Sequence, residues 1–363
     1  MDRKLRIGVI GAGGILAPHA QGYKSMADKC EVVAVSKRNA DSDAKKWIYD
    51  QIGHEVPVYT DYNELLQRGD IDAVDIITPH DLHMPMTVAA ARAGKHVLVE
   101  KVMARNIDEC DRMIAACAAA GVSLYVCHDR RYLGAWAAIK ELIDSGVLGN
   151  IFYLKLEHNQ NVVLPAGNWI RSYDQVGGGA LISCLTHQID ALRWFGGEVA
   201  AVACMTKVLP ERMEGDTAAV MTATMASGAL ANLSINWFTT VNMEGSGLFC
   251  ELIHVCGDKG EAYYTETGGT RYKIHDKGQI ANDSYRFDIA PSGAGFTKVE
   301  PKDLTSGIPR CVQEWIKTLR NENGQMLTPG TDSRKTVEVA EAAYRSFREK
   351  RFMDLPISPE VFQ

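Results

Sequence analysis

The residues LRIGVIGAGGIL, Leu5–Leu16, contain a strand-like run, a glycine loop and the start of a helix-like segment. We expect a buried strand over LRIGVIG and a helix from about Ile15. The spacing of the glycines is typical of a dinucleotide-binding loop, in which one glycine permits a tight turn and another lets the backbone approach a pyrophosphate. A plain turn is the alternative, because Leu16 replaces the third glycine or alanine of that pattern. The context favours a dinucleotide site formed by Gly11, Gly13, Gly14 and Ile15.

The chain as far as Cys127 continues this alternation of strand and helix. Strand-like runs lie at residues 31–36, 56–60, 73–78, 96–99 and 122–127. Helix-like segments separate them, one of which starts at Asp61 as an N-cap and ends at Gly69. Short β-branched runs alternating with helices predict an α/β domain with a doubly wound parallel sheet. We therefore expect residues 1–127 to form the dinucleotide-binding domain.

Residues 128–363 have a different pattern. After a predicted helix at 132–145, strand-like runs follow one another at 147–161, 199–209, 217–226, 228–238, 247–257 and 260–266. Helical patterns return at 310–322 and 333–350. Consecutive strands with short connections predict one large antiparallel sheet in a second, α+β domain.

The composition narrows the class of protein. A chain of 363 residues is long enough for two domains, and 46% hydrophobic with 23% charged residues is typical of a globular protein. The net charge of −6 gives no field that attracts nucleic acid or an anionic membrane. Glycines interrupt the first apolar run too early for a signal peptide or a spanning helix. Nine scattered cysteines without a C-x-x-C pair indicate reduced thiols in the cytoplasm.

The end of the second predicted strand bears on the choice of dinucleotide. An acid there would bind the ribose hydroxyls of NAD, but this chain has Ser36, Lys37 and Arg38, with no acid before Asp41. A hydroxyl and two cations suit the 2′-phosphate of NADP. The sequence favours NADP, and NAD bound beside two solvated charges is the alternative.

Four stretches together resemble one known family. IGVIGAGGI, TPHDLHMPMTVAAARAGKHVLVEK, GGGALISCLTHQIDALRWFGGE and AYRSFREKRFMDLP are similar, in this order, to signatures of the glucose–fructose oxidoreductase / inositol dehydrogenase / rhizopine-catabolism (Gfo/Idh/MocA) family. The resemblance implies an N-terminal Rossmann domain and a C-terminal domain on an open, predominantly antiparallel sheet. It also implies an active site between the domains and a homodimer or homotetramer that packs through that sheet.

The Glu-Lys pair after the fifth predicted strand is the first catalytic candidate that the resemblance implies. Glu100 would face the cofactor ribose, and Lys101 would face the substrate hydroxyl as well as the cofactor. Burial and a cationic nicotinamide both favour the neutral amine, which accepts a proton. A plain ion pair between Lys101 and Glu100 or another carboxylate is the alternative. Relatives often have proline next, commonly after a cis bond, whereas this chain has Val102, so we expect a trans bond or a strained one.

The second catalytic candidate is His187 in GGGALISCLTHQID. By the resemblance it points into the cleft, where a histidine near neutral pKa takes the alcohol proton. Relatives commonly place an aspartate four residues earlier, where this chain has Ser183. This replacement shifts proton handling toward Lys101 or a less basic His187, and a satisfied core histidine is the alternative. We interpret Asp190 as structural.

The remaining site residues also rest on the resemblance. Thr78, Pro79 and His83 would line the nicotinamide side, whereas His80 is expected in an exposed loop. The substrate-facing candidates are His128, His158, Asn168, Trp169 and His187. Trp169 would stack on a sugar ring. A metal held by Cys184, His187 and His158 lacks ligand spacing, so we expect none.

The leading functional hypothesis is an NAD(P)-dependent dehydrogenase for a secondary hydroxyl of a sugar, glycoside or cyclic polyol, or the reverse reduction. Redox-neutral oxidation and elimination of a glycoside with retained NAD is one alternative, and a non-catalytic NAD(P)-binding regulator is another. Arg130, Arg131 and Arg171 would permit an acidic substrate without requiring one. No nucleic-acid or membrane partner is expected.

Overall fold

The computed structural model describes residues 3–239, 249–275, 296–299 and 307–357. Contacts divide the chain into two units: the described residues within Met1–Tyr132 and Thr305–Lys335 form unit 1, and those within Leu133–Leu304 and Thr336–Gln363 form unit 2. The sequence predicts only residues 1–127 in the first domain. The described residues of 305–335 also belong to unit 1.

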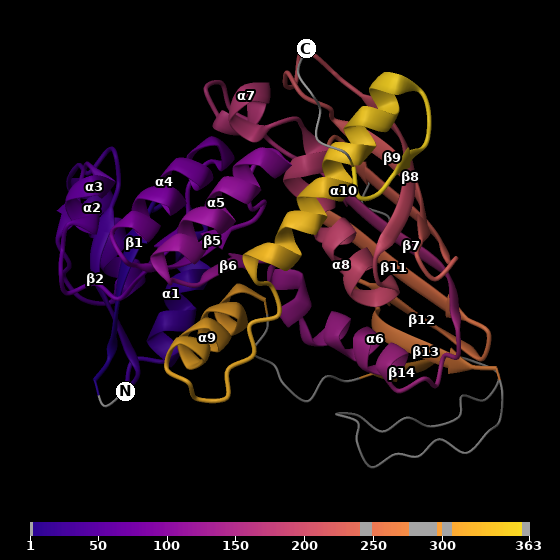
Figure 1. The fold of residues 1–363 in the computed structure, drawn as a ribbon, viewed down its shortest axis with the longest axis horizontal. Coiled ribbons are helices and arrows are strands. Elements are labelled where there is room, and N and C mark those ends of the chain that lie inside the picture. The colour runs from indigo at the N-terminus through magenta and orange to yellow at the C-terminus, as the bar shows by residue number, and fades with distance from the viewer. Residues whose placement is uncertain (1–2, 240–248, 276–295, 300–306, 358–363) are drawn as a thin grey trace. The chain divides into compact units, whose positions relative to one another are not determined.

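Unit 1 contains a six-stranded sheet in which every neighbouring pair is parallel. Its strand order is β3-β2-β1-β4-β5-β6, the order of a Rossmann fold. The strands are β1 (Leu5–Ile10), β2 (Cys30–Ser36), β3 (Val58–Tyr59), β4 (Ala73–Ile76), β5 (His96–Glu100) and β6 (Leu124–Cys127). The helices are α1 (Leu16–Ser25), α2 (Ser42–Ile52), α3 (Tyr62–Leu66), α4 (His80–Arg92), α5 (Ile107–Ala120) and α9 (Ile308–Leu319). The predicted doubly wound domain is confirmed (Figure 1).

The helices of unit 1 pack in two groups, with α1 against α2 and α9, and α4 against α3 and α5. The apolar face of α9 places Val312 and Trp315 in the same core as Leu16 of α1. Gly22 permits the close approach of these helices, because a Cβ there would lie 2.7 Å from the Cβ of Val312. Residues far apart in the sequence thus complete one core.

Unit 2 is built on a nine-stranded sheet with the order β14-β13-β12-β11-β7-β10-β9-β8-β15. The strands are β7 (Ile151–Gln160), β8 (Val199–Lys207), β9 (Ala218–Met225), β10 (Leu230–Asn236), β11 (Phe249–Gly257), β12 (Gly260–Thr265), β13 (Gly269–Ile274), β14 (Thr297–Val299) and β15 (Met353–Asp354). β7 and β10 pair in parallel and the other pairs are antiparallel, so the predicted predominantly antiparallel sheet is confirmed. Gly247 and Leu248, predicted to begin one strand, lie outside the described residues.

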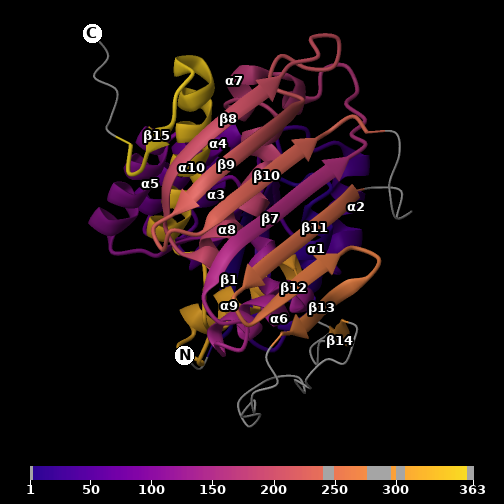
Figure 2. The same cartoon turned by 90° about the vertical axis from the view of Figure 1, so that its right-hand side faces the viewer.

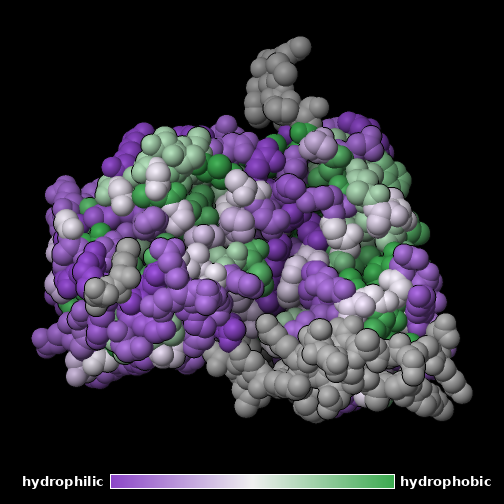
Figure 3. Space-filling model, turned by 60° about the horizontal axis from the view of Figure 1, so that its bottom comes forward, coloured by the Kyte–Doolittle hydropathy of each residue, from purple (hydrophilic) through white to green (hydrophobic). Residues whose placement is uncertain are grey.

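The helices of unit 2 are α6 (Gly134–Asp144), α7 (Tyr173–Val176) and α8 (Thr186–Gly196), with α10 (Gly330–Glu349) beginning in unit 1 and continuing here. The helices α6 and α8 lie behind the sheet in Figure 2, and its other face looks toward the viewer. Successive side chains of β10 point to opposite faces of the sheet. Leu233 is buried on the face that the helices cover, whereas Leu230 is exposed on the other face. Hydrophobic and hydrophilic side chains mix on the face shown in Figure 3.

Within the described residues, every helix is too short or too polar to traverse a bilayer.

Candidate active site

The glycine loop joins β1 to α1 beside the end of β4. Gly11 has a φ of +97°, and a Cβ there would overlap the carbonyl oxygen of Ile77, so this position requires glycine. A Cβ at Gly13 or Gly14 would have no described atom within 4 Å. Ile15 is 48% exposed and no side chain caps the start of α1. Open space before an uncapped helix N-terminus fits a pyrophosphate.

Leu16 replaces the third glycine of the motif because its side chain belongs to the core. It is fully buried with residues of β1 and β2. The loop therefore leaves open space at Gly13 and Gly14, whereas the third position of the motif serves core packing.

The residues after β2 differ in what they contact. Ser36 is buried, Lys37 donates from Nζ to the carbonyl oxygen of Ala12 at 2.8 Å, and Arg38 is exposed. Asp41 is the N-cap of α2 and accepts from the backbone N–H of Ala44 at 2.8 Å. The first acid after β2 thus serves helix α2, and Lys37 supports the glycine loop, a contact that the sequence analysis did not anticipate.

His83 connects the segments that follow β4 and β5. Its Nδ1 lies 2.8 Å from the carbonyl oxygen of Val102, and its Nε2 lies 2.8 Å from that of Thr78. Burial lowers the pKa of His83, against the effect of these carbonyls. A neutral imidazole donates through one nitrogen only, so one carbonyl at a time accepts a hydrogen bond from the neutral ring. His83 therefore holds the two segments together, with Pro79 immediately before α4.

The prediction that His80 lies in an exposed loop is wrong. His80 is the first residue of the helix α4 and is only 2% exposed. Its ring centroid is 5.7 Å from that of His83, because residues three apart share a helix face.

Glu100 ends β5 and is buried. Its Oε2 accepts from the backbone N–H of Lys101 at 3.1 Å, and its Oε1 lies 3.0 Å from Nε2 of His19. The side chain of Lys101 is half-buried. The Lys101–Val102 peptide bond is cis, so of the two alternatives, a trans bond or a strained one, the trans bond is wrong. Val102 is fully buried and its carbonyl oxygen lies against His83.

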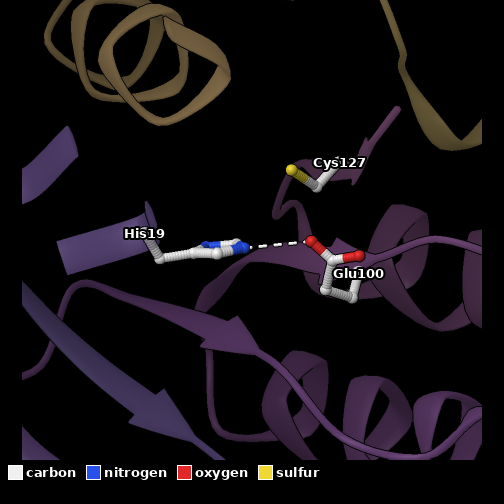
Figure 4. Close-up of side chains that lie close together, drawn as sticks. All are labelled: His19, Glu100 and Cys127. Atoms are coloured by element: carbon white, nitrogen blue, oxygen red, sulfur yellow. Dashed lines mark hydrogen bonds and ion pairs between the residues drawn. The ribbon is translucent and has the colours of Figure 1, made fainter. Parts of the chain in front are cut away.

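His19 in α1 is the member of this site that the sequence analysis missed (Figure 4). It is fully buried, with Nδ1 2.7 Å from Oδ2 of Asp75 in β4, and Tyr23 donates to the same carboxylate at 2.5 Å. Burial alone lowers the pKa of His19, but Asp75 and Glu100 raise it well above its usual value. Burial raises the pKa of Glu100, but His19 and Lys101 lower it overall. A cationic His19 therefore bonds to the carboxylates of both Asp75 and Glu100 and holds them in place.

A sequence signal for this network exists. His19 and Tyr23 are four residues apart on one helix face, and Asp75 lies inside an apolar strand, where a carboxylate requires a partner. The ligand atoms of His19, Glu100 and Cys127 lie within 4.8 Å of one another, as in a metal site. However, both ring nitrogens of His19 already bond to carboxylates, which explains the cluster without a metal.

In unit 2, three consecutive glycines at residues 177–179 precede a π-helical turn, Leu181–Leu185, which continues into α8. A Cβ at Gly179 would overlap the backbone of Asp216. The Asp216 carboxylate accepts from the N–H of Leu181 at 2.8 Å and from the hydroxyl of Tyr344 at 2.6 Å. Gly179 therefore allows Asp216 to approach the π-helical turn, and the bond from Leu181 fixes the direction of that turn.

His187 lies in the first turn of α8 and is buried, as is Ser183 in the π-helical turn. Asp190 is fully buried and accepts from the hydroxyl of Thr336 in α10 at 3.3 Å. This bond between helices supports the structural interpretation of Asp190.

His158 and Glu251 face each other across β7 and β11. Nδ1 of His158 is 2.9 Å from Oε1 of Glu251, and Gln188 of α8 donates to the same oxygen at 3.4 Å. Burial lowers the pKa of His158, but hydrogen bonds with Cys184 and Glu251 raise it to about 9. His158 is therefore cationic at neutral pH.

The other predicted substrate residues have contacts within their own units. His128 is fully buried after β6, and Asn168 accepts from the N–H of Ile170 at 2.9 Å, which caps the short turn that contains Trp169. Arg131 bonds to Asp332 at 2.7 Å. Arg130, Arg131 and Arg171 all contact protein groups. Each of these guanidinium groups therefore already has a bonding partner within the protein.

Comparison with known proteins shows the family of this chain. A family model described as "Oxidoreductase family, NAD-binding Rossmann fold" matches residues 5–128, and the "GFO/IDH/MocA C-terminal domain" matches residues 136–263. Myo-inositol 2-dehydrogenase of Thermotoga maritima is 26% identical over 97% of this chain and 98% of the relative. D-apiose dehydrogenase of Paraburkholderia graminis is 25% identical over 97% of this chain and 90% of the relative.

Among solved structures, the WlbA dehydrogenase of Bordetella pertussis, in complex with NADH and UDP-GlcNAcA, has a TM-score of 0.82. It is 24% identical, covers 98% of this chain and is itself covered completely, which shows the shared fold. The Rossmann unit with its glycine loop, matched by this family model, defines the class as NAD-binding oxidoreductases. The chain belongs to the GFO/IDH/MocA oxidoreductase family and is an enzyme.

Proposed function

We propose that this enzyme transfers a hydride between a secondary hydroxyl, or the corresponding ketone, of a sugar, glycoside or cyclic polyol and NAD(P). The observation that carries the proposal is the grouping of Glu100 and Lys101 with the glycine loop and Thr78 at the carboxyl ends of β5, β1 and β4. Relatives that span nearly the whole chain are named dehydrogenases of myo-inositol and D-apiose. These names support the substrate class without selecting one member.

The nicotinamide, when bound, supplies the hydride acceptor or donor. Glu100 would bind the cofactor ribose, with its carboxylate oriented by His19. Lys101 would hold and polarise the substrate hydroxyl, and His187 would remove or relay its proton. Thr78 and Pro79 would contact the nicotinamide side, and His83 would keep their backbone against the segment after β5.

The substrate would be oriented by His128, His158, Asn168 and Trp169. His158 is cationic at neutral pH, because Glu251 and Cys184 raise its pKa to about 9, so it favours an electron-rich oxygen of the substrate. Trp169 is partly exposed and offers an aromatic face to a sugar ring.

The preference for NADP over NAD stays a prediction. Ser36 and Arg38 support it, because a hydroxyl and an exposed guanidinium at the end of β2 suit a 2′-phosphate. Lys37 is bonded to Ala12, which makes Arg38 the main phosphate ligand of this proposal.

Turnover with a panel of sugars, glycosides and polyols, followed by nicotinamide absorbance with both cofactors, tests the proposal. Accumulation of reduced nicotinamide with at least one polyol or sugar supports the dehydrogenase. Release of a glycosidic product without net reduction of the nicotinamide identifies the redox-neutral elimination. This alternative is retained because Ser183 stands where relatives commonly have an aspartate. Cofactor binding without any turnover identifies a regulator.

A homodimer or homotetramer through the sheet of unit 2 belongs to the same proposal. Met205 of β8 and Val220 of β9 are paired neighbours and exposed on the sheet face that α8 does not cover. Light scattering of the purified protein tests the assembly. Nine free cysteines support a location in the reducing cytoplasm.

A further inference from the structure

A group of metal-ligating side chains lies on the sheet of unit 2, on strands that carry none of the proposed catalytic residues. We propose that His254, Cys256 and Glu261, with His275 as the fourth ligand, bind one Zn²⁺ or a similar transition-metal ion per chain.

The strand geometry brings these three side chains to one face. His254 and Cys256 are two residues apart in β11, whereas their neighbours Ile253 and Val255 are fully buried on the opposite face. Glu261 of β12 is the direct antiparallel partner of Cys256. β11, β12 and β13 lie side by side in Figure 2.

The ligand atoms are close together. Nε2 of His254 is 2.7 Å from Oε2 of Glu261 and 3.3 Å from Sγ of Cys256, and all three atoms lie within 4.8 Å of one another. Ligand atoms around a tetrahedral zinc are about 3.5 Å apart, because each bond is about 2.0–2.3 Å. Small side-chain rotations therefore suffice to accept the ion.

His275 completes the set. It follows β13, its backbone N–H donates to the carbonyl oxygen of Lys259 at 2.6 Å, and its Nε2 lies 3.5 Å from Oε1 of Glu261. It is also exposed, so its ring is able to turn toward the ion.

The donor set selects the class of metal. Two imidazoles, a thiolate and a carboxylate suit zinc and other borderline ions, whereas Mg²⁺ and Ca²⁺ require oxygen ligands. An ion pair between His254 and Glu261 explains their contact without a metal. It does not explain why a thiol and a second imidazole lie beside the pair. The bound ion would join β11, β12 and the end of β13.

Cobalt substitution of the full-length, chelator-treated protein tests the site. We expect one Co²⁺ per chain, a thiolate-to-cobalt charge-transfer band, and displacement by Zn²⁺. Cys256→Ser should abolish that band, and His254→Gln should weaken Zn²⁺ binding by at least about tenfold. Cys250→Ser is the matched control, because Cys250 lies on the same face of the same strand, and it should bind as the original chain does.

Zn²⁺ should also raise the thermal midpoint of the original chain and of Cys250→Ser, but not of Cys256→Ser. Circular dichroism verifies that each variant is folded. A missing charge-transfer band in the original chain, or unchanged binding by folded Cys256→Ser, would overturn the proposal. Neither result depends on dehydrogenase turnover.

Discussion

His19 and Glu100 are 81 residues apart in the sequence, yet Nε2 of one lies 3.0 Å from Oε1 of the other. The other ring nitrogen of His19, Nδ1, lies 2.7 Å from Oδ2 of Asp75, so a cation stands between two carboxylates and the two bonds connect α1 with β4 and β5. The helix that begins at the glycine loop therefore also orients the residue proposed to bind the cofactor ribose.

Replacing His19 by Gln should raise the KM for the dinucleotide several-fold with a smaller change in kcat, because Glu100 loses its cationic partner. Breaking a buried ion pair also costs roughly 3 to 5 kcal/mol of unfolding free energy. Tyr23→Phe is the control, because it removes a hydroxyl bonded to Asp75 and keeps the bond between His19 and Glu100. Equal changes in KM for both variants would contradict the positioning role of His19.

Two glycine substitutions should separate folding from cofactor binding. Gly11→Ala should lower the unfolding free energy by about 2 kcal/mol or more, because φ is positive and the methyl group overlaps Ile77. Gly13→Ala should leave stability unchanged, because no described atom lies within 4 Å of the added carbon. It should nevertheless weaken dinucleotide binding by about tenfold or more, because we propose that the pyrophosphate occupies that space. Unchanged binding by Gly13→Ala, measured by fluorescence titration, would show that the phosphates lie elsewhere.

Arg38→Glu should raise the KM for NADP at least about tenfold more than the KM for NAD, because it reverses the charge proposed to contact the 2′-phosphate. Lys45→Glu, an exposed change in α2, is the matched control for net charge. An equal loss with both cofactors would remove Arg38 from the phosphate site.

His187→Ala should lower turnover by at least about 100-fold if His187 handles the substrate proton. Cofactor affinity should stay unchanged, because the residues proposed to bind the cofactor belong to unit 1. A loss of less than about tenfold would return proton handling to Lys101 alone, and Lys101→Met should then account for the larger loss.

His158 should make stability depend on pH. Its pKa is raised from 6.5 to about 9 in the folded protein, so its contribution is complete below pH 6.5 and is lost as the pH rises through about 9. The contribution is on the order of 3 kcal/mol. Chemical unfolding between pH 6 and 10 should show this decline, and His158→Gln should reduce it. If the unfolding free energy depends on pH equally in both proteins, a group other than His158 is responsible for the decline.

The Rossmann domain could be predicted because its signals are local. The glycine loop and the alternation of β-branched strands with helices depend on residues close in the sequence, and the backbone preferences of glycine and hydrophobic periodicity act at that range. The same reasoning correctly predicted the parallel sheet and the predominantly antiparallel sheet. It also identified Asp61 as an N-cap.

Other features depended on contacts between distant residues. The return of α9 to the core of unit 1, the burial of His80 and the bonds of His19 to Asp75 and Glu100 follow from packing between distant elements. The cross-strand pairing of Cys256 with Glu261 is of the same kind. Local patterns specify strands, helices and turns, whereas the partner of a buried charge is established only when the elements pack, because desolvation and pairing depend on distance in space.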